Sequence, residues 1–500
     1  MALEHFDVLV VGAGLSGIGA AVHLQTRCPG RSVAILESRE RLGGTWDLFR
    51  YPGVRSDSDM YTLGYAFRPW TDPKAIADGP AILRYVQDTA REHGIDRRIR
   101  FGHRVVRAAW DTPTARWTLD IERDGDAGPL RLSCGFLLMC SGYYRYDAGH
   151  TPDFAGRDTF RGRIVHPQHW TEDIAHAGQR VVVIGSGATA VTLVPALARS
   201  AAHVTMLQRS PTWMVALPSE DRLANGLRRV LPARIAYAAT RWKQVLLQTA
   251  SFNLCRRRPK LARSLLLRGV RARLGPGHDI ERHFTPRYNP WEQRLCLVPD
   301  ADFFRALRSG KASVVTDTIE RFTETGIRLA SGTELEADLI VTATGLDLQV
   351  LGGVALEVDG APADLAKTLA YKGMMFSEVP NLVSVFGYTN ASWTLKADLT
   401  CEYVCRLLNH MHERGLVQCT PRNTDPTITA QPWIDFSSGY VQRSLALFAK
   451  QGSRAPWKLH QNYARDLLLL RFGKLDDGVL AFAAATALAP SPARGRGSGA

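Results

Sequence analysis

The chain has 500 residues, of which 45% are hydrophobic and 22% are charged, as is usual for a globular protein of two to four domains. No apolar run reaches the roughly 18 residues that a membrane-spanning helix needs. Eight cysteines are scattered without a CxxC pair, which predicts reduced thiols, a cytoplasmic protein and no metal site. The first apolar run, Val8–Val11, has no basic region before it, so we expect a strand there and not a signal peptide.

The first glycine turn follows this expected strand. Gly12, Gly14 and Gly17 stand between it and an expected helix. Such glycines let backbone amides approach a pyrophosphate, and the helix N-terminus attracts its negative charge. The next strand ends at Glu37, twenty residues after Gly17, where a carboxylate accepts hydrogen bonds from ribose hydroxyls and repels a 2′-phosphate. This turn therefore favours FAD or NAD.

Two later segments, 136–142 and 339–345, are apolar strands that end in small residues and glycine. Two-dinucleotide flavoproteins use such strands where the chain crosses between domains, which places Gly345 at the cofactor. Taken alone, each segment is better explained as an ordinary buried strand with its turn glycine. Between 111 and 132 the alternating pattern predicts a hairpin.

A second glycine turn follows the apolar run 181–184. It contains Gly185 and Gly187 and continues into Ala188 and Thr189 at the start of another expected helix. One such turn would be weak evidence. Two turns in the same strand-turn-helix context predict two dinucleotides placed so that electrons pass between them. The expected fold is α/β, with two dinucleotide-binding, Rossmann-like domains.

The strand after the second turn ends in Arg209 and Ser210 and has no carboxylate there. A guanidinium can grip a 2′-phosphate through two parallel hydrogen bonds, so this turn favours NADPH. The alternative is an ordinary surface arginine at the end of a strand.

The net charge of +14 is concentrated between Asp221 and Asp279. That stretch contains fourteen lysines and arginines and no acidic residue, and its apolar residues follow mixed helical spacing. The pattern predicts basic amphipathic helices. Two interpretations stay open: a solvated helical insertion that also attracts anionic NADPH, or peripheral association of residues 222–273 with an anionic membrane. The dinucleotide turns give no support for a nucleic acid as partner.

These elements predict a domain organisation in which each dinucleotide unit is interrupted. The oligomeric state is left open. The expected parts are an FAD-binding domain (1–145 and 335–488), an NADPH-binding domain (146–210 and 285–334), a helical insertion (211–284) and a disordered tail rich in Pro, Gly, Ser, Arg and Ala (489–500).

Between the two turns, Phe160, Gly162, His166 and Trp170 fill the pattern FxGxxxHxxxW. This pattern resembles the signature of Baeyer–Villiger monooxygenases, although Thr171 stands where that signature has Pro or Asp. Related flavin monooxygenases that oxygenate amines and sulfides usually carry Tyr or Phe at the position of Trp170. The resemblance implies a linker between the dinucleotide units, which suits domain rotation. A hydrogen-bonded structural histidine is the alternative for His166.

A second signature of the same family begins with Gly43-Gly44-Thr45-Trp46, continues with Tyr51-Pro52-Gly53 and ends at Asp57. The segments 44–70, 289–299 and 387–398 look like the subgroup that activates the thioamide prodrug ethionamide, and the resemblance runs from about residue 5 to 475. It implies that Gly44, Thr45, Trp46 and Asp57 contact the cofactors. For Trp46, packing in the core is the alternative.

The resemblance also implies a reaction. NADPH reduces FAD, the reduced flavin adds O₂ at C4a, and the resulting peroxyflavin inserts one oxygen atom next to a ketone carbonyl to give an ester or lactone. Sulfides or thioamides are further substrates. By resemblance, Arg294 is the cation that keeps the peroxide anionic, and Asp57 holds Arg294 in place. A purely structural salt bridge is the alternative. Gln293 replaces a lysine of better-known members, so NADPH preference rests more on Arg209 and Ser210.

Three other functions fit parts of the pattern. One is an oxygenase of amines or sulfides that forms no ester. Another is a reductase that passes electrons from NADPH to a disulfide or a protein carrier, but Cys28 has no partner at the spacing that such enzymes use. A protein that only binds membrane surfaces is disfavoured, because both dinucleotide turns are intact.

Overall fold

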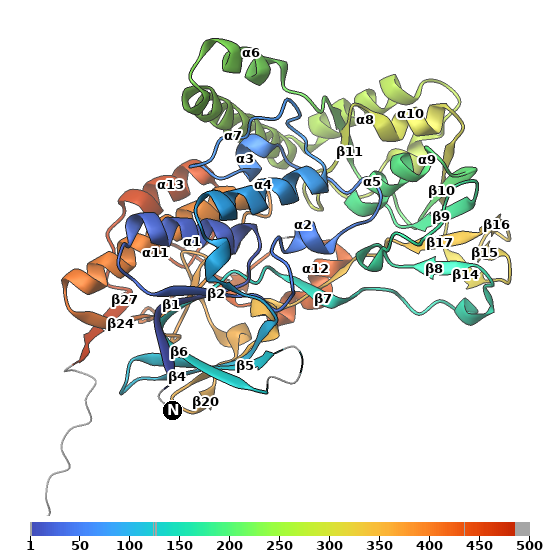
Figure 1. Ribbon diagram of the computed structural model, residues 1–500. Helices are drawn as coiled ribbons and strands as arrows, with labels where there is room; N and C mark the ends of the chain where they lie inside the picture. Colours follow the sequence, from blue (N-terminus) through green and yellow to red (C-terminus); the bar gives the residue numbers. More distant parts are fainter. Residues whose placement is uncertain (1–2, 124, 126–127, 435, 486–500) are drawn as a thin grey trace, which may run out of the picture.

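The computed structural model describes residues 3–123, 125, 128–434 and 436–485. Two sheets carry the two glycine turns, the first at the lower left of Figure 1 and the second at the right. This arrangement confirms the predicted α/β fold with two dinucleotide-binding units. The predicted tail, 489–500, lies outside the described residues.

The first sheet combines parallel and antiparallel strands around β1. Strand β1 pairs in parallel with β2 and β6, while β4, β5 and β6 form the antiparallel meander that was predicted as a hairpin. In the described chain its order is β20-β19-β4-β5-β6-β1-β2-β3, with β23 also paired to β6. Its strands are β1 (Glu4–Val11), β2 (Val33–Leu36), β3 (Ile99–Arg100), β4 (His103–Asp111), β5 (Arg116–Arg123), β6 (Leu130–Met139), β19 (Ala355–Val358), β20 (Ala361–Pro362) and β23 (Leu382–Ser384).

The second sheet is parallel, with the order β13-β10-β9-β17-β8 among the described strands. The sequence assigned the run at 339 to the FAD-binding part that begins at 335, and this placement is wrong. Strand β17 pairs with β8 and β9, because a short strand that is buried throughout fits between two parallel neighbours. The strands are β8 (Arg163–Val165), β9 (Arg180–Ile184), β10 (His203–Gln208), β13 (Ala312–Thr316) and β17 (Leu339–Thr342).

Both glycine-turn strands are covered on both faces. Alternate residues of a strand point to opposite sides of the sheet. In β1, Val8 and Val10 belong to one hydrophobic core and Leu9 to another, and in β9 Val181 and Val182 are divided in the same way. Continuous apolar runs are therefore required here, which is why both strands are evident in the sequence.

Helices connect and cover these sheets. Helix α1 follows β1 and α5 follows β9, so each turn ends at a helix N-terminus. Within the described residues the α-helices are α1 (Leu15–Arg27), α2 (Thr45–Leu48), α3 (Met60–Leu63), α4 (Gly79–Glu92), α5 (Ala188–Leu197), α6 (Arg222–Val230), α7 (Ala233–Arg257), α8 (Pro259–Leu274), α9 (Ile280–Phe284), α10 (Asp302–Arg308), α11 (Trp393–Glu413), α12 (Gly439–Ser444) and α13 (Tyr463–Phe472).

The predicted helical insertion is present as α6, α7 and α8, at the top of Figure 1. It begins after the short strand β11, which pairs with β12. The smaller sheets and pairs consist of β7 (Tyr144–Gly149), β11 (Met214–Leu217), β12 (Cys296–Pro299), β14 (Ile319–Phe322), β15 (Gly326–Leu329), β16 (Glu334–Glu336), β18 (Leu346–Leu348), β21 (Ala370–Tyr371), β22 (Met375–Phe376), β24 (Leu416–Pro421), β25 (Ala430–Pro432), β26 (Lys450–Gly452) and β27 (Leu480–Ala484).

Candidate active site

A cavity of about 1220 Å³ lies between the two dinucleotide units. It is lined by both glycine turns and by segments from the middle and the end of the chain. Most of the predicted site residues meet there, although they come from widely separated parts of the sequence. Those that line it are Gly12, Gly14, Glu37, Gly44, Thr45, Trp46, Asp57, Gly185, Gly187, Ala188, Thr189, Arg209, Ser210, Arg294 and Gly345.

The first glycine turn packs directly against backbone atoms of neighbouring segments. Gly12 has φ +104°, and a Cβ at this residue would lie 2.6 Å from the carbonyl oxygen of Cys140. Gly17 does not line the cavity; its missing side chain lets α1 pack on the turn, since a Cβ there would lie 1.9 Å from the Gly12 oxygen. Gly14 faces Gly44, so two bare backbones form this part of the wall. A dinucleotide phosphate fits such a cradle.

Glu37 lies at the end of β2, beside the turn, and is buried. Its Oε2 accepts a hydrogen bond of 2.7 Å from the Ala13 amide, and its Oε1 accepts one of 3.0 Å from the Arg39 amide. Burial raises the pKa of this carboxyl, although the two amides act in the opposite direction. The side chain is thus fixed where a ribose hydroxyl of a dinucleotide in the turn would meet it.

The second turn is more open. Gly185 has φ +134°, and a Cβ there would lie 2.3 Å from the Ala343 oxygen, so this glycine is required by packing. A Cβ on Gly187 would meet no atom within 4 Å, and α5 begins after it without a side-chain cap. Arg209 and Ser210 stand exposed at the end of β10. Free amides next to an exposed guanidinium suit a phosphate-bearing dinucleotide.

Arg294 and Asp57 form an ion pair in the cavity wall, although 237 residues separate them in the sequence. The Arg294 Nε lies 2.6 Å from the Asp57 Oδ2, and the Arg294 Nη1 donates a hydrogen bond of 3.2 Å to the Thr389 carbonyl. About a third of each side chain of the pair is exposed, toward the cavity that both line. Burial is the largest single influence and acts against the charge of Arg294, but the negative fields of Asp57, Tyr143 and Tyr440 and the hydrogen bond to Asp57 together raise the pKa of the guanidinium.

Close packing on α5 positions Asp57. Gly53 has φ +77°, and a Cβ there would lie 2.7 Å from the Ala196 Cβ and 3.0 Å from the Thr192 oxygen. The turn before Asp57 is therefore held against the helix that starts at the second glycine turn. This contact explains why position 53 of the second signature is a glycine, and it ties the ion pair to both units.

The linker residues Phe160, Gly162, His166 and Trp170 do not line the cavity. Phe160 and Trp170 are buried in two separate hydrophobic clusters of the second unit, and a Cβ on Gly162 would lie 2.4 Å from the Asp338 oxygen. His166 touches the site indirectly, through a contact of 3.1 Å between its Nε2 and the Gly345 oxygen. Its Nδ1 accepts from the Gln168 amide at 3.2 Å, so the ring is neutral, with the proton on Nε2. Burial lowers the pKa of His166, which favours this neutral form.

Several cavity residues were not found from the sequence. Tyr143 and Tyr440 line the wall beside Arg294, and their hydroxyls contribute to its raised pKa. Tyr143 stacks on Trp393, with ring centroids 5.2 Å apart. Arg39, which also lines the cavity, lies over the Tyr146 ring. Isolated tyrosines carry no motif, so only the fold could bring them to the site.

Comparison with known proteins identifies the family. The Flavin-binding monooxygenase-like model matches residues 72–248, and the NAD(P)-binding Rossmann-like domain model matches residues 10–77. The FAD-containing monooxygenase EthA of Mycobacterium tuberculosis is 57% identical over 96% of this chain and 98% of its own length. The probable FAD-binding monooxygenase AlmA of Acinetobacter baylyi is 47% identical over 96% of both chains.

The chain is a member of the FAD-containing monooxygenase family. Among solved structures, this monooxygenase resembles a steroid monooxygenase bound to NADP, with a TM-score of 0.70, 25% identity and coverage of 83% of this chain and 87% of the other. A cyclohexanone monooxygenase from Rhodococcus shares the fold at 21% identity, with a TM-score of 0.70 over 84% and 87% of the two chains. The predicted family resemblance and the class of flavin-dependent oxidoreductase are therefore confirmed.

In the described part of this monooxygenase, no three or more His, Cys, Asp or Glu side chains are grouped so that they could hold a metal ion. No helix among the described residues is both long and apolar enough to cross a membrane.

Proposed function

We propose that this monooxygenase uses NADPH and O₂ to insert one oxygen atom next to a ketone carbonyl, giving an ester or lactone, and that it also oxidises sulfides or thioamides. The observation that carries the proposal is the Arg294–Asp57 pair, which lies in the wall between the two glycine turns. Oxygen transfer to a ketone passes through a negatively charged adduct, so it needs a permanent cation at that place.

Arg294 meets this requirement. A guanidinium is charged throughout the ordinary pH range, and the raised pKa of Arg294 strengthens this property. Asp57 and the Thr389 carbonyl hold the Nε and Nη1 groups, whereas Nη2 has no hydrogen-bond partner among the described residues. The guanidinium is therefore fixed in orientation and keeps donors for a negative oxygen, without reorganisation during the reaction. We assign Arg294 as the catalytic cation and Asp57 as the residue that positions it.

The two turns supply the cofactor sites in this proposal. When bound, FAD accepts a hydride from NADPH and activates O₂ for oxygen-atom transfer. The first turn, Glu37 and the Gly44-Thr45-Trp46 segment would hold FAD, and Gly345 would close its edge. Gly185, Gly187, Ala188 and Thr189 would hold the NADPH pyrophosphate, and Arg209 with Ser210 its 2′-phosphate. Apart from Gly17, which packs behind the first turn, the predicted cofactor-binding residues line one cavity. The linker around His166, which does not line the cavity, would let the second unit move against the first without entering the chemistry.

Product analysis tests the proposal. The purified holoenzyme is incubated with NADPH, isotope-labelled O₂ and either a linear methyl ketone or a thioether. We expect an ester with one labelled oxygen from the ketone and a labelled sulfoxide from the thioether. Labelled sulfoxide without any ester would favour the alternative, an amine- or sulfide-oxygenating flavin monooxygenase.

A further inference from the structure

The helical insertion exposes an unusual number of large apolar side chains. Eleven of the sixteen exposed ones in the described chain fall between residues 217 and 265. We call the exposed side of α6, α7 and α8 the basic helical face; these helices lie together at one end of the molecule, opposite β4 and β5 (Figure 1). Its apolar members, on and between these helices, are Leu223, Val230, Leu231, Ile235, Trp242, Leu246, Leu247, Leu254, Leu261 and Leu265, and the eleventh exposed residue, Leu217, precedes them at the end of β11.

Helix α7 has two different sides. Its exposed Ile235, Trp242 and Leu246 are spaced by seven and four residues, so they lie on one side of the helix. Tyr237 and Arg241, spaced by four, lie on the opposite side and are buried. Helix α7 already buries one side against its own protein, and the apolar stripe on its other side remains exposed. Such a stripe in contact with water is costly and marks a surface that meets another apolar phase.

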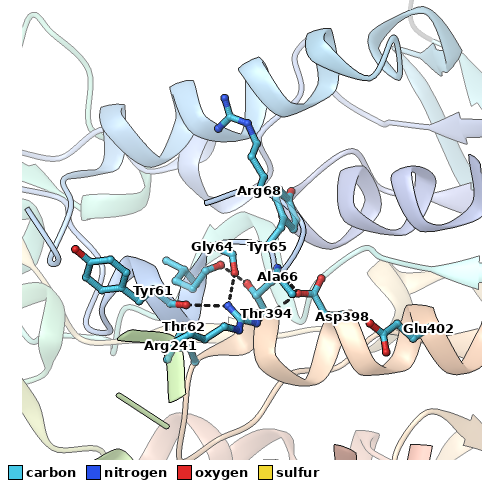
Figure 2. Close-up of polar contacts among 12 residues, drawn as sticks. Tyr61, Thr62, Gly64, Tyr65, Ala66, Arg68, Arg241, Thr394, Asp398 and Glu402 are labelled. Atoms are coloured by element: carbon cyan, nitrogen blue, oxygen red, sulfur yellow. Dashed lines mark hydrogen bonds and ion pairs between the residues drawn. The ribbon is translucent and has the colours of Figure 1, made fainter. Parts of the chain in front are cut away.

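A buried arginine fixes the orientation of α7. Figure 2 shows Arg241 reaching into the first unit, where its Nη1 donates to the carbonyls of Tyr61 at 2.8 Å and of Gly64 at 2.7 Å. Its Nη2 lies 3.4 Å from the Asp398 Oδ2 on α11. Gln248, two turns further along, donates to the Asp59 Oδ2 at 2.8 Å. The outer stripe of α7 is therefore presented in one fixed direction by polar contacts that cannot form in another rotation of the helix.

The same helices carry many exposed positive charges. No acidic residue occurs between Asp221 and Asp279. In the described structure, Arg271 of this face pairs with Glu281, but seven other exposed cations have no carboxylate within ion-pair distance. These are Arg222, Arg229, Arg234, Arg257, Arg258, Lys260 and Arg268.

We propose that the basic helical face docks on an anionic lipid membrane. Exposed leucines, an exposed tryptophan and unpaired cations on helices that lie along the surface are the combination that binds the headgroup region of such a membrane. The charge complementarity favours anionic lipid over a second copy of the chain, because two copies of this face would repel each other.

The docking face adjoins the wall of the cavity. Val245, on α7, packs with Tyr388, and Tyr388 lines the cavity. Further along α7, Phe252 contacts the ring of Trp291, three residues before Arg294. Docking would thus place lipid about one helix diameter, roughly 10 Å, from the cavity wall. A substrate that partitions into lipid would be concentrated at this end of the molecule.

Vesicle flotation with the FAD-loaded, full-length protein tests the proposal. We expect binding to vesicles of phosphatidylcholine with phosphatidylglycerol, at least about tenfold weaker binding to phosphatidylcholine alone, and progressive release as salt is raised, because several cations contribute. Equal binding to both vesicle types, or no binding at low salt, would overturn it.

Variants separate the contribution of the apolar side chains to vesicle binding from that of the positive charges. Leu246→Gln should weaken vesicle binding about fivefold, and Arg257→Gln/Arg258→Gln about tenfold. Leu447→Gln is the control for the first, because Leu447 is 55% exposed, close to the 63% of Leu246, but lies outside the insertion. Arg97→Gln/Arg414→Gln removes the same charge from exposed positions elsewhere. If either control weakens binding as much as its partner, the basic helical face is not the docking surface.

Light scattering of the protein without vesicles tests whether a second copy of the chain, and not lipid, covers the basic helical face. We expect the oligomeric state of Leu246→Gln to equal that of the unchanged protein. If the unchanged protein self-associates and Leu246→Gln does not, the face is an interface between copies, and the lipid proposal is wrong. Oxygenation of a small thioether in the absence of vesicles should be unaffected by these variants, since none of the changed residues lines the cavity.

Discussion

The two glycine turns share a pattern but differ in how they are enclosed. The first faces Gly44, and its acidic residue, Glu37, is buried and held by two backbone amides. The second leaves Gly187 in open space, and its basic residue, Arg209, is exposed. A pre-formed, enclosed cradle suits a cofactor that stays bound, whereas an open turn with an exposed cation suits one that enters and leaves. The asymmetry matches a retained flavin and an exchanging nicotinamide.

Changing the first glycine of each turn tests this comparison with the largest expected effect. Gly12→Ala places a Cβ 2.6 Å from a backbone oxygen at φ +104°, and Gly185→Ala places one 2.3 Å from a backbone oxygen at φ +134°. We expect Gly12→Ala to lose FAD. Gly185→Ala should retain FAD and lose its reduction by NADPH. Flavin content and the rate of anaerobic reduction measure the two outcomes.

Gly30→Ala is the control for these two variants. Gly30 has φ +86°, but a Cβ there would meet nothing within 4 Å. The Gly30→Ala variant should therefore bear only the strain of a positive φ at a non-glycine residue. It should keep both FAD binding and the reduction of FAD by NADPH. Loss of FAD from Gly185→Ala would mean that the two turns do not act as separate sites.

Replacement of Arg209 or Glu37, the side chains that distinguish the two nucleotide sites, should have effects of intermediate size. Arg209→Gln should raise KM for NADPH about tenfold to a hundredfold and leave KM for NADH unchanged, because only the 2′-phosphate loses its charged hydrogen bonds. Glu37→Gln should weaken FAD binding about tenfold without changing the preference between NADPH and NADH. Arg199→Gln, an exposed arginine that does not line the cavity, is the control. An equal change of KM for both nucleotides in Arg209→Gln would reject the phosphate role.

A substitution of His166 in the linker should have the smallest effect. It should change the thermal stability by an amount that depends on pH. Because burial lowers the pKa of His166 below its ordinary value of 6.5, its contribution to stability is complete above that pH and is lost as pH falls through the lower, folded-state value. We expect the Tm difference between the unchanged protein and His166→Ala to be a few degrees at pH 8 and to shrink as the pH falls below 6. A difference that grows under acid conditions would contradict the neutral ring assigned here.

The fold and much of the site could be predicted from local patterns of residue types in the sequence. Both turns need continuous apolar strands that are buried on two faces, so the runs that contain Val8 and Val181 are recognisable from their residue types alone. The contact between Asp57 and Arg294 followed from the family resemblance, and the structure brings the pair to 2.6 Å. The roles of these two residues remain proposals.

Other features depend on which parts of the chain meet. An apolar strand does not specify which sheet it joins, and for this reason β17 was assigned to the wrong unit. Arg241 looks like its thirteen basic neighbours in the sequence, yet it alone is buried, because the carbonyls of Tyr61 and Gly64 are supplied by a remote segment. Tyr143 and Tyr440 were missed for the same reason.

The most direct test of the central claim is a two-step measurement on Arg294→Ala, with Arg294→Lys beside it. We predict that NADPH reduces the flavin of Arg294→Ala as fast as that of the unchanged protein, while ester formation from a methyl ketone falls by about 10² to 10³-fold. Arg294→Lys should recover part of this loss, because it restores the charge but not the fork of donors. Ester formation by Arg294→Ala at close to the normal rate would contradict the account.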